Sequence, residues 1–217
     1  MFLGYFLLFL IPLNYSFLQR TPKKIITISP SGLHGYYLLG ITSYIKEHYD
    51  LRDYVFSGAS AGSWISLIMS YKGNHRKIIK DVLQVSESSK KSIKDLGKGL
   101  RNLFLDGKYH IHDFDMKRCY MGLIDVNQKG SRTIIYHNFQ SMEDAIHCCI
   151  ASSHVPFIMG DLFRKYRNLY AIDGGFSDRP YHGNGHINGN CLEIQDDSCE
   201  INPIIKAQLH IHPFIWY

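Results

Sequence analysis

Apolar residues fall into two patterns along this chain, short continuous runs and longer stretches with helical spacing. Two runs near the start, Lys24–Ile28 and Leu51–Ser57, are rich in β-branched and aromatic residues and predict buried strands. Each is followed by small residues and then by an apolar segment that predicts a helix, beginning near Tyr36 and Trp64. The pattern therefore predicts two successive units of strand, loop and helix.

The second half of the chain continues this alternation. Ser141, which is followed by two acidic residues, predicts the start of a helix that runs through Ala151. Further strands are expected at Cys119–Val126, Arg132–His137, Leu169–Ile172 and Ile204–His212. Strands that alternate with helices are typical of an α/β fold with a mostly parallel central sheet, and we expect that fold class here.

The length of 217 residues fits one domain with an ample core, which we place at residues 23–217, after an apolar N-terminal segment at 1–22. The apolar run at 2–13 is shorter than the about 20 residues that a membrane span needs. It also lacks the basic start of a signal peptide. A membrane anchor, a signal and an arm packed on the domain all stay open. Membrane contact would make the protein membrane-associated; otherwise a cytoplasmic location is expected.

Composition excludes several classes of protein. A hydrophobic content of 45% with 20% charged residues is that of a globular chain, not a disordered one. The five cysteines form no C-x-x-C pair, so reduced thiols are expected, with a Cys191–Cys199 bridge only in an oxidising compartment. No set of Asp, Glu or Cys residues completes a convincing metal site with the pairs His110/His112 and His210/His212, so no metal is predicted. No cofactor is predicted either.

The positive charge of the chain is concentrated in one segment. Residues 72–108 hold ten basic residues and four acidic ones, against a net charge of +5 for the whole chain. Within this segment apolar residues recur at helical spacing, at Ile93, Leu96, Leu100, Leu103 and Phe104. A basic amphipathic helix suits an anionic membrane surface, but an ordinary surface helix has the same pattern. Nucleic acid is not expected as a partner, because no recognised binding motif accompanies the charge.

The strongest chemical signal is the pentapeptide from Gly58 to Gly62, Gly-Ala-Ser-Ala-Gly, with Ser60 at its centre. It follows a predicted strand and precedes a predicted helix, which is the context of a nucleophile elbow. Small flanking residues allow the sharp turn, and the start of a helix stabilises negative charge on the serine or on a neighbouring oxyanion. Ser60 is therefore the candidate nucleophile.

Asp173 is the candidate partner of Ser60. It ends the predicted strand Leu169–Ile172, and Gly174 and Gly175 follow it, so that the backbone can turn tightly beside the carboxylate. In open α/β sheets ligands collect at the carboxyl ends of strands. A carboxylate within hydrogen-bond reach of Ser60 could accept the serine proton. The alternative is an aspartate that only caps the Gly174-Gly175 turn.

Together these motifs resemble the patatin-like phospholipase family over about residues 24–180. The loop that ends Gly32-Leu33-His34-Gly35 and the segment Ala151-Ser152-Ser153-His154-Val155-Pro156 also match the family's pattern. In length the chain is similar to compact patatin-like proteins of large DNA viruses. The resemblance implies a three-layer α/β/α domain that hydrolyses acyl-lipid esters through a Ser60–Asp173 dyad and an acyl-serine, without a metal. It also implies that Ser31, Gly32, Leu33 and Gly35 form the oxyanion-binding loop.

The same loop departs from the family pattern. Pro30 stands where the family has a glycine, and proline has no N–H to donate; His34 replaces a basic residue. Losing one oxyanion donor costs about 10²–10³ in rate. The loop also has a reading without any ligand, in which Ser31 simply caps the following helix.

Three functions are consistent with these residues. The leading one is a lipid acyl hydrolase, similar to a phospholipase A, that acts on phospholipid or another acyl lipid at a membrane surface. The second is an esterase with a Ser-His-Asp triad, whose histidine would be His154 or one of those after Asp173, at positions 182, 186, 210 and 212. The third is a weakly active or inactive protein of the same fold that binds lipid or membrane.

Overall fold

The computed structural model describes residues 24–89, 92–127, 130–176, 193–194 and 209–211. The strands are β1 (Lys24–Ile28), β2 (Tyr54–Ala59), β3 (Cys119–Asn127), β4 (Gly130–His137), β5 (Arg164–Tyr166), β6 (Leu169–Ile172), β7 (Glu193–Ile194) and β8 (Leu209–Ile211). The α-helices are α1 (Gly35–His48), α2 (Ala61–Ser70), α3 (His75–Ser88), α4 (Ile93–Leu105) and α5 (Met142–Ser152). Short 3₁₀ turns include Gly32–His34 and Gly174–Phe176, on either side of the site described below.

All the strands belong to one mixed sheet, with the order β5-β6-β3-β2-β1-β8 and with β4 and β7 beyond β3. The pairs β8-β1, β1-β2 and β2-β3 are parallel, whereas β3-β4, β3-β6 and β5-β6 are antiparallel. From β1 to β2 to β3 the chain moves in one direction across the sheet. Because crossovers between parallel strands are right-handed, both connections place their helices on the same face.

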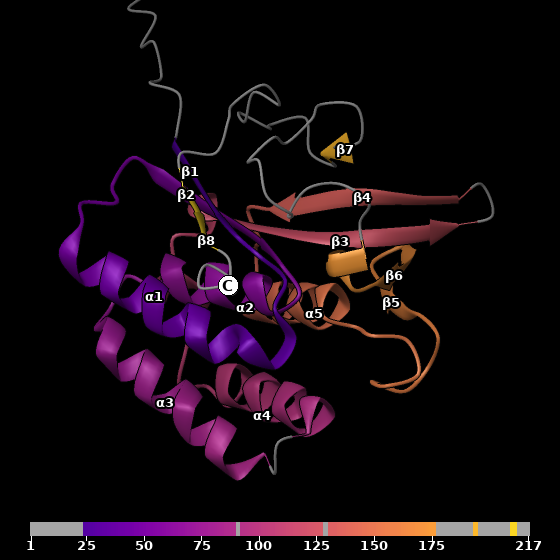
Figure 1. The fold of residues 1–217 in the computed structure, drawn as a ribbon, viewed down its shortest axis with the longest axis horizontal. Helices are drawn as coiled ribbons and strands as arrows, with labels where there is room; N and C mark the ends of the chain where they lie inside the picture. The colour runs from indigo at the N-terminus through magenta and orange to yellow at the C-terminus, as the bar shows by residue number, and fades with distance from the viewer. Residues whose placement is uncertain (1–23, 90–91, 128–129, 177–192, 195–208, 212–217) are drawn as a thin grey trace, which may run out of the picture.

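The described α-helices accordingly lie on one side of the sheet, with α1, α2 and α5 next to it and α3 and α4 outside them (Figure 1). The mixed α/β fold is the one predicted. The helices on both faces that a three-layer domain requires are not seen among the described residues. The direction of the crossovers from β1 to β3 explains this arrangement for α1 to α4.

Most predicted elements are present, with differences at their ends. The strand predicted at Leu51–Ser57 begins later, at Tyr54, and continues to Ala59, directly before the turn at Ser60. The helix after Ser141 is α5, and the Ser141 hydroxyl accepts a hydrogen bond from the Asp144 N–H at 3.1 Å. β5 is not among the predicted strands; it forms because its backbone pairs with β6. Of the strand predicted at 204–212, residues 209–211 are described.

The main core fills the space between the sheet and the helices. Phe56 of β2 and Met121 of β3 point into it and meet Leu67 and Ile68 of α2. Neighbouring strand residues face the other way, because successive side chains alternate between the faces of a sheet. On that second face Ile25, Val55, Tyr120 and Ile135 form a separate buried cluster. The central strands are therefore apolar on both faces, as parallel strands usually are.

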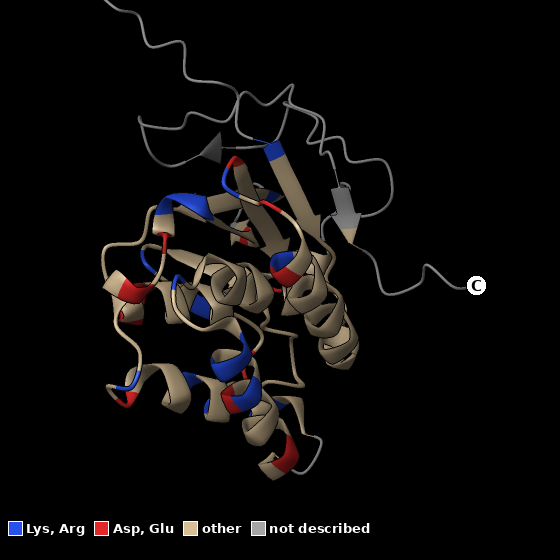
Figure 2. Cartoon of the chain, turned by 90° about the vertical axis from the view of Figure 1, so that its left-hand side faces the viewer, with Lys and Arg blue, Asp and Glu red and all other residues tan. Residues whose placement is uncertain are grey.

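The amphipathic helix predicted in the basic segment is α4, and its apolar face is directed into the protein. Leu100 and Phe104 are buried, and Leu96 and Leu103 pack against the same core. Charged residues of both signs remain on the outer helices α3 and α4, in the lower part of Figure 2. The apolar face of α4 is thus used in folding, as in an ordinary surface helix.

Two further expectations concern cysteines and membrane spans. Cys119, Cys148 and Cys149 are buried free thiols of the core, and burial raises the pKa of each. Cys191 and Cys199, and the apolar segment at 1–22, lie outside the described residues. In the described part of the chain, no helix has the length and apolar character that crossing a bilayer requires.

The turn between β2 and α2 depends on two glycines. A Cβ atom at Gly58 would lie 2.3 Å from the Gly62 carbonyl oxygen, and one at Gly62 would lie 2.3 Å from the Ile28 carbonyl oxygen. Real side chains never come so close to backbone atoms. The backbone of β1, the end of β2 and the start of α2 can therefore meet only because these residues have no side chain.

We expect Gly58→Ala to lower the free energy of unfolding by about 1–3 kcal/mol, the usual cost of overpacking a rigid site. Thermal unfolding followed by circular dichroism measures this as a lower Tm. The matched control is Gly40→Ala in α1, where no atom lies within 4 Å of the new Cβ. Because alanine is the better helix former by up to about 1 kcal/mol, the control should keep or raise the Tm. Equal Tm values for the two variants would contradict the packing argument.

Candidate active site

Ser60 lies in the sharp turn between β2 and α2. Its backbone angles are φ 54° and ψ −126°, a conformation that residues other than glycine rarely adopt. Such strain costs of order 1–3 kcal/mol and persists only where the surroundings enforce it. The Ser60 carbonyl accepts hydrogen bonds from the N–H and the hydroxyl of Ser63, at 3.0 and 2.6 Å. The first turn of α2 therefore holds the strained residue from one side.

Ser152, at the end of α5, holds Ser60 from the other side. The Ser60 N–H donates to Ser152 Oγ at 2.9 Å, and the Ser152 hydroxyl donates to the Gly122 carbonyl of β3 at 2.6 Å. Both hydrogen bonds are buried, and Ser152 is fully buried. Sequence reasoning did not assign this role. The only sequence signal was the membership of Ser152 in the segment 151–156 that carries the family resemblance.

Asp173 reaches Ser60 because β2 and β6 share one edge of β3. β4 pairs along the other edge of β3. On the shared edge, β2 pairs with residues 119–122 of β3, and β6 pairs with residues 124–125 of β3. β6 is antiparallel to β3, so it runs toward the end of β2. The sequence predicted a site at the carboxyl ends of parallel strands. Instead, the ends of β2 and β6 point at each other along one edge of β3.

The glycine after Asp173 makes this close approach possible. A Cβ at Gly174 would lie 2.5 Å from the Gly122 carbonyl oxygen and 2.8 Å from the Cβ of Ala59. The Asp173 N–H donates to the His154 carbonyl at 2.9 Å, which fixes the backbone after β6 to the end of α5. The missing side chain of Gly174 therefore lets the turn after β6 approach the end of β2 and the backbone of β3.

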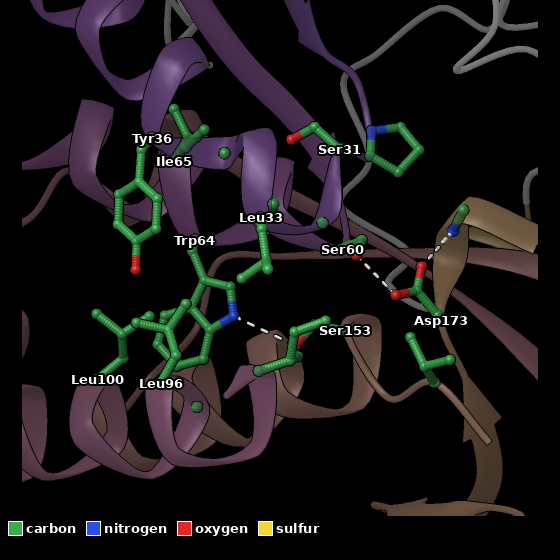
Figure 3. A pocket seen from close by; sticks show the side chains of 18 of the residues that line it. Ser31, Leu33, Tyr36, Ser60, Trp64, Ile65, Leu96, Leu100, Ser153 and Asp173 are labelled. Atoms are coloured by element: carbon green, nitrogen blue, oxygen red, sulfur yellow. Dashed lines mark hydrogen bonds between the residues drawn. The ribbon is translucent and has the colours of Figure 1, made fainter. Parts of the chain in front are cut away.

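The two side chains are in direct contact. Ser60 Oγ donates a hydrogen bond to Asp173 Oδ2 at 2.6 Å, and the other carboxylate oxygen, Oδ1, accepts the Gly175 N–H at 2.6 Å (Figure 3). Asp173 therefore does not only cap the glycine turn. Its Oδ1 caps the turn, and its Oδ2 accepts the hydrogen bond from the serine. Ser60 and Asp173 are 6% and 4% exposed, so water competes little for this contact.

Burial sets the protonation behaviour of Asp173. It raises the pKa of the carboxyl to about 6, against the opposing effect of the hydrogen bonds from Ser60 and Gly175, which favour the ionised form. A carboxylate with a pKa near 6 is ionised at neutral pH and is a stronger base than an exposed aspartate. That is the property a proton acceptor for Ser60 needs.

The predicted oxyanion-binding loop lies beside Ser60 and forms part of the same pocket. The N–H groups of Ser31, Gly32 and Leu33 have no hydrogen-bond partner within the described residues. Gly35 was expected to contribute to the loop, but its N–H donates to the Gly32 carbonyl, and its lack of a side chain leaves room for Ala61 instead. The alternative in which Ser31 caps the helix is wrong, because its hydroxyl makes no hydrogen bond to the helix.

A largely apolar pocket of about 420 Å³ extends from Ser60 and Asp173 between the inner and outer helices. Volumes of about 300–1,000 Å³ are typical of small-molecule sites. Its walls come from the start of α1, the first turns of α2, the α3–α4 pair and the loop after α5. Side chains that line it include Leu39, Trp64, Ile65, Ile68, Val82, Ile93, Leu96 and Leu100. The serine hydroxyl thus stands at one end of an apolar cavity.

The histidine alternatives receive no support in the described part of the chain. His154 is buried, and its Nε2 contacts the Asp161 carbonyl at 2.9 Å; its carbonyl, not its ring, accepts a hydrogen bond from the Asp173 N–H. No histidine of the described residues lines the pocket. Those at positions 182, 186 and 212 lie outside the described residues, and at 210 only the backbone pairing with β1 is described. No group of three potential metal ligands occurs among the described side chains.

No protein-family model and no curated protein matches this chain. A serine hydroxyl on a strained turn donates to a buried carboxylate, next to unused N–H groups and an apolar cavity. This arrangement can activate the serine as a nucleophile and stabilise an oxyanion.

We expect Ser152→Ala to destabilise the protein by about 1–3 kcal/mol, because it leaves the buried N–H of Ser60 without an acceptor. Chemical denaturation measures the change. The control is Ser66→Ala, which removes an equally buried hydroxyl that only donates to a helix carbonyl, that of Gly62. Because no buried donor loses its acceptor in this variant, the control should lower the free energy of unfolding by less than about 1 kcal/mol. A control as costly as Ser152→Ala would refute the role of the Ser60 N–H.

The raised pKa of Asp173 predicts a pH-dependent gain in stability for Asp173→Asn. The native pKa of about 6 exceeds the ordinary 3.8, so the wild type is fully stabilised below pH 3.8 and loses stability as the pH rises through 6. Relative to the wild type, the variant should gain on the order of 3 kcal/mol between pH 4 and pH 8. Denaturation midpoints at several pH values test this.

The control for that series is Asp50→Asn. Asp50 is exposed, and its hydrogen bond with Arg52 lowers its pKa to about 2. Its contribution to stability is present above pH 3.8 and is lost as the pH falls, so its variant should change in the opposite direction. A pH series for Asp173→Asn that runs parallel to the wild type would show that the carboxyl is not perturbed.

Proposed function

We propose that this protein is a lipid acyl hydrolase, a serine-dependent carboxylic ester hydrolase that cleaves fatty-acyl esters. The observation that carries the proposal is the 2.6 Å hydrogen bond from Ser60 Oγ to the buried carboxylate of Asp173 at one end of an apolar cavity. A hydroxyl so placed has both a proton acceptor and a site for an apolar acyl chain. The cavity favours a long-chain substrate over a small polar ester.

The first half of the reaction acylates Ser60. As Ser60 Oγ attacks the ester carbonyl carbon, its proton passes to Asp173 Oδ2. The carbonyl oxygen gains negative charge, which the N–H groups of Gly32 and Leu33 and the start of α2 are suited to stabilise. When the tetrahedral intermediate collapses, the ester C–O bond breaks, Asp173 returns the proton to the leaving alcohol oxygen, and an acyl-serine remains.

The second half of the reaction restores the enzyme. A water molecule takes the place of the alcohol, and Asp173 accepts one of its protons while its oxygen attacks the acyl carbon. The bond from Ser60 Oγ to the acyl carbon then breaks, and Asp173 gives the proton back to Ser60. The fatty acid leaves with the oxygen of the water. Every proton transfer uses the same carboxylate, so this cycle has no step for a histidine.

The patatin-like architecture is part of the same proposal. The turn at Ser60, the unused N–H groups after Pro30 and the Asp173-Gly174-Gly175 turn support it, because the three motifs meet at one site. The missing N–H of Pro30 still leaves those of Ser31, Gly32 and Leu33 in the loop. We propose phospholipid or another acyl lipid as the substrate class, which the apolar cavity favours, and a membrane surface as its source.

The central test compares the wild type with Ser60→Ala and Asp173→Asn on a long-chain p-nitrophenyl ester. Ser60→Ala should abolish hydrolysis, and Asp173→Asn should lower it by roughly 10²–10⁴-fold, the usual contribution of a general base. Because the ionised carboxylate is the base, wild-type kcat/KM should rise with pH through about 6 and then level off.

Labelling with a fluorophosphonate provides a second readout of the same site. Ser60 Oγ forms a bond to phosphorus as fluoride leaves, so the wild type and the control Ser88→Ala, a serine on α3, should both be labelled. Ser60→Ala should not be labelled. If the wild type itself is neither labelled nor active, the hydrolase proposal fails and an inactive lipid-binding protein of this fold becomes the better account.

A further inference from the structure

The loop that connects α5 to β5, residues 153–163, carries large apolar side chains on its outer surface. Phe157 is 79% exposed and Ile158 is 61% exposed, and Leu162 and Phe163 are also exposed. We call these four side chains the apolar tip. In most soluble proteins exposed apolar residues are scattered singly, whereas a contiguous group marks an interaction site.

The loop that carries the apolar tip is held in place by hydrogen bonds. The Met159 N–H donates to the Val155 carbonyl at 3.0 Å, and His154 Nε2 contacts the Asp161 carbonyl at 2.9 Å. Phe157 has a φ of 65°, in the left-handed region that bulky residues rarely adopt. The backbone is therefore strained in the conformation that turns Phe157 outward.

The apolar tip continues the wall of the cavity. Val155 and Met159, on the same loop, line the cavity, while Phe157 and Ile158 between them face solvent. Two other cavity-lining segments also expose an apolar side chain, Leu33 at 44% and Phe176 at 56%. Three separate segments of the chain that line the cavity thus also carry exposed apolar side chains.

Basic residues border this apolar surface. Arg164 and Lys165 follow Phe163 directly and are exposed, against one acidic residue of the loop, Asp161. On the other side the loop packs on α4, where a Cβ at Gly97 would lie 3.4 Å from Cε of Met159. Apolar side chains with a basic border match the two layers of a lipid surface, acyl chains below and phosphates above.

We propose that the apolar tip inserts into a phospholipid surface and seats the cavity opening on it, so that an acyl chain passes from the lipid layer to Ser60 without crossing water. This inference rests on the proposed function, because it names the surface from which the substrate enters. The apolar face of α4 packs on the core and lines the cavity, so the loop after α5 takes the membrane role for which the basic helix was one candidate.

The experiment measures binding without turnover. The full chain with Ser60→Ala is floated with vesicles of phosphatidylcholine containing a minority of phosphatidylserine, with and without the double change Phe157→Asp and Ile158→Asp. Neither side chain lines the cavity. We expect the double change to weaken binding by at least about tenfold, since two exposed apolar side chains no longer leave water.

The matched control is the double change Tyr44→Asp and Tyr49→Asp in the same background. These tyrosines are 58% and 62% exposed near the end of α1. Each of the two double variants adds two negative charges. The control should bind like its parent. The proposal is overturned if the parent does not bind vesicles, if both doubles bind as the parent does, or if both lose binding equally.

A second readout separates this proposal from the proposed function. With Ser60 intact, the Phe157/Ile158 double should hydrolyse a soluble short-chain p-nitrophenyl ester within about twofold of the wild type but lose at least about tenfold on phospholipid vesicles. Vesicle binding that depends on Phe157 and Ile158, combined with no turnover of either substrate by the protein with Ser60 intact, would uphold the membrane surface and reject the hydrolase. Turnover on vesicles that is insensitive to the double change would reject the membrane surface and uphold the hydrolase.

Discussion

The site depends on the meeting of two strand ends along one edge of β3. β2 pairs with the first part of that edge and β6 with the next part, and the two strands run toward each other. Gly174 lies in the gap between them, where a side chain would clash with the Gly122 carbonyl of β3 and with Ala59 of β2. Ser60 follows one strand and Asp173 the other, so the hydrogen bond between them is a consequence of how the sheet is paired.

Several features of the site cost stability, and the fold around it compensates for them. Ser60 has a strained backbone, and Asp173 is a buried carboxylate whose pKa is raised by desolvation. The Ser152 hydroxyl supplies the acceptor that the Ser60 N–H would otherwise lack, and Gly175 supplies a donor to Asp173. Strain and a perturbed pKa in one pocket are typical of a functional site rather than of a purely structural one.

The apolar cavity gives the two outer helices their role in the site. α3 and α4 form a second helix layer outside α1, α2 and α5 (Figure 1), and residues of both helices line the cavity. The residues of α4 that first indicated a membrane-binding helix, Leu96 and Leu100, line this cavity instead. A helix with one apolar face buries it against whatever apolar surface is available, and here that surface belongs to the same chain.

The sequence by itself determined the local features of the protein: the strands β1, β3 and β6, the turn at Ser60, and the Asp173-Gly174-Gly175 turn. These depend on periodicity and on small residues, which act over a few neighbouring positions. The antiparallel direction of β6, the placement of the described helices on one face, the Ser152 link and the outward apolar tip were decided only by the tertiary structure. Each depends on backbone pairing or packing between segments far apart in the chain, and periodicity carries no information about which segments meet.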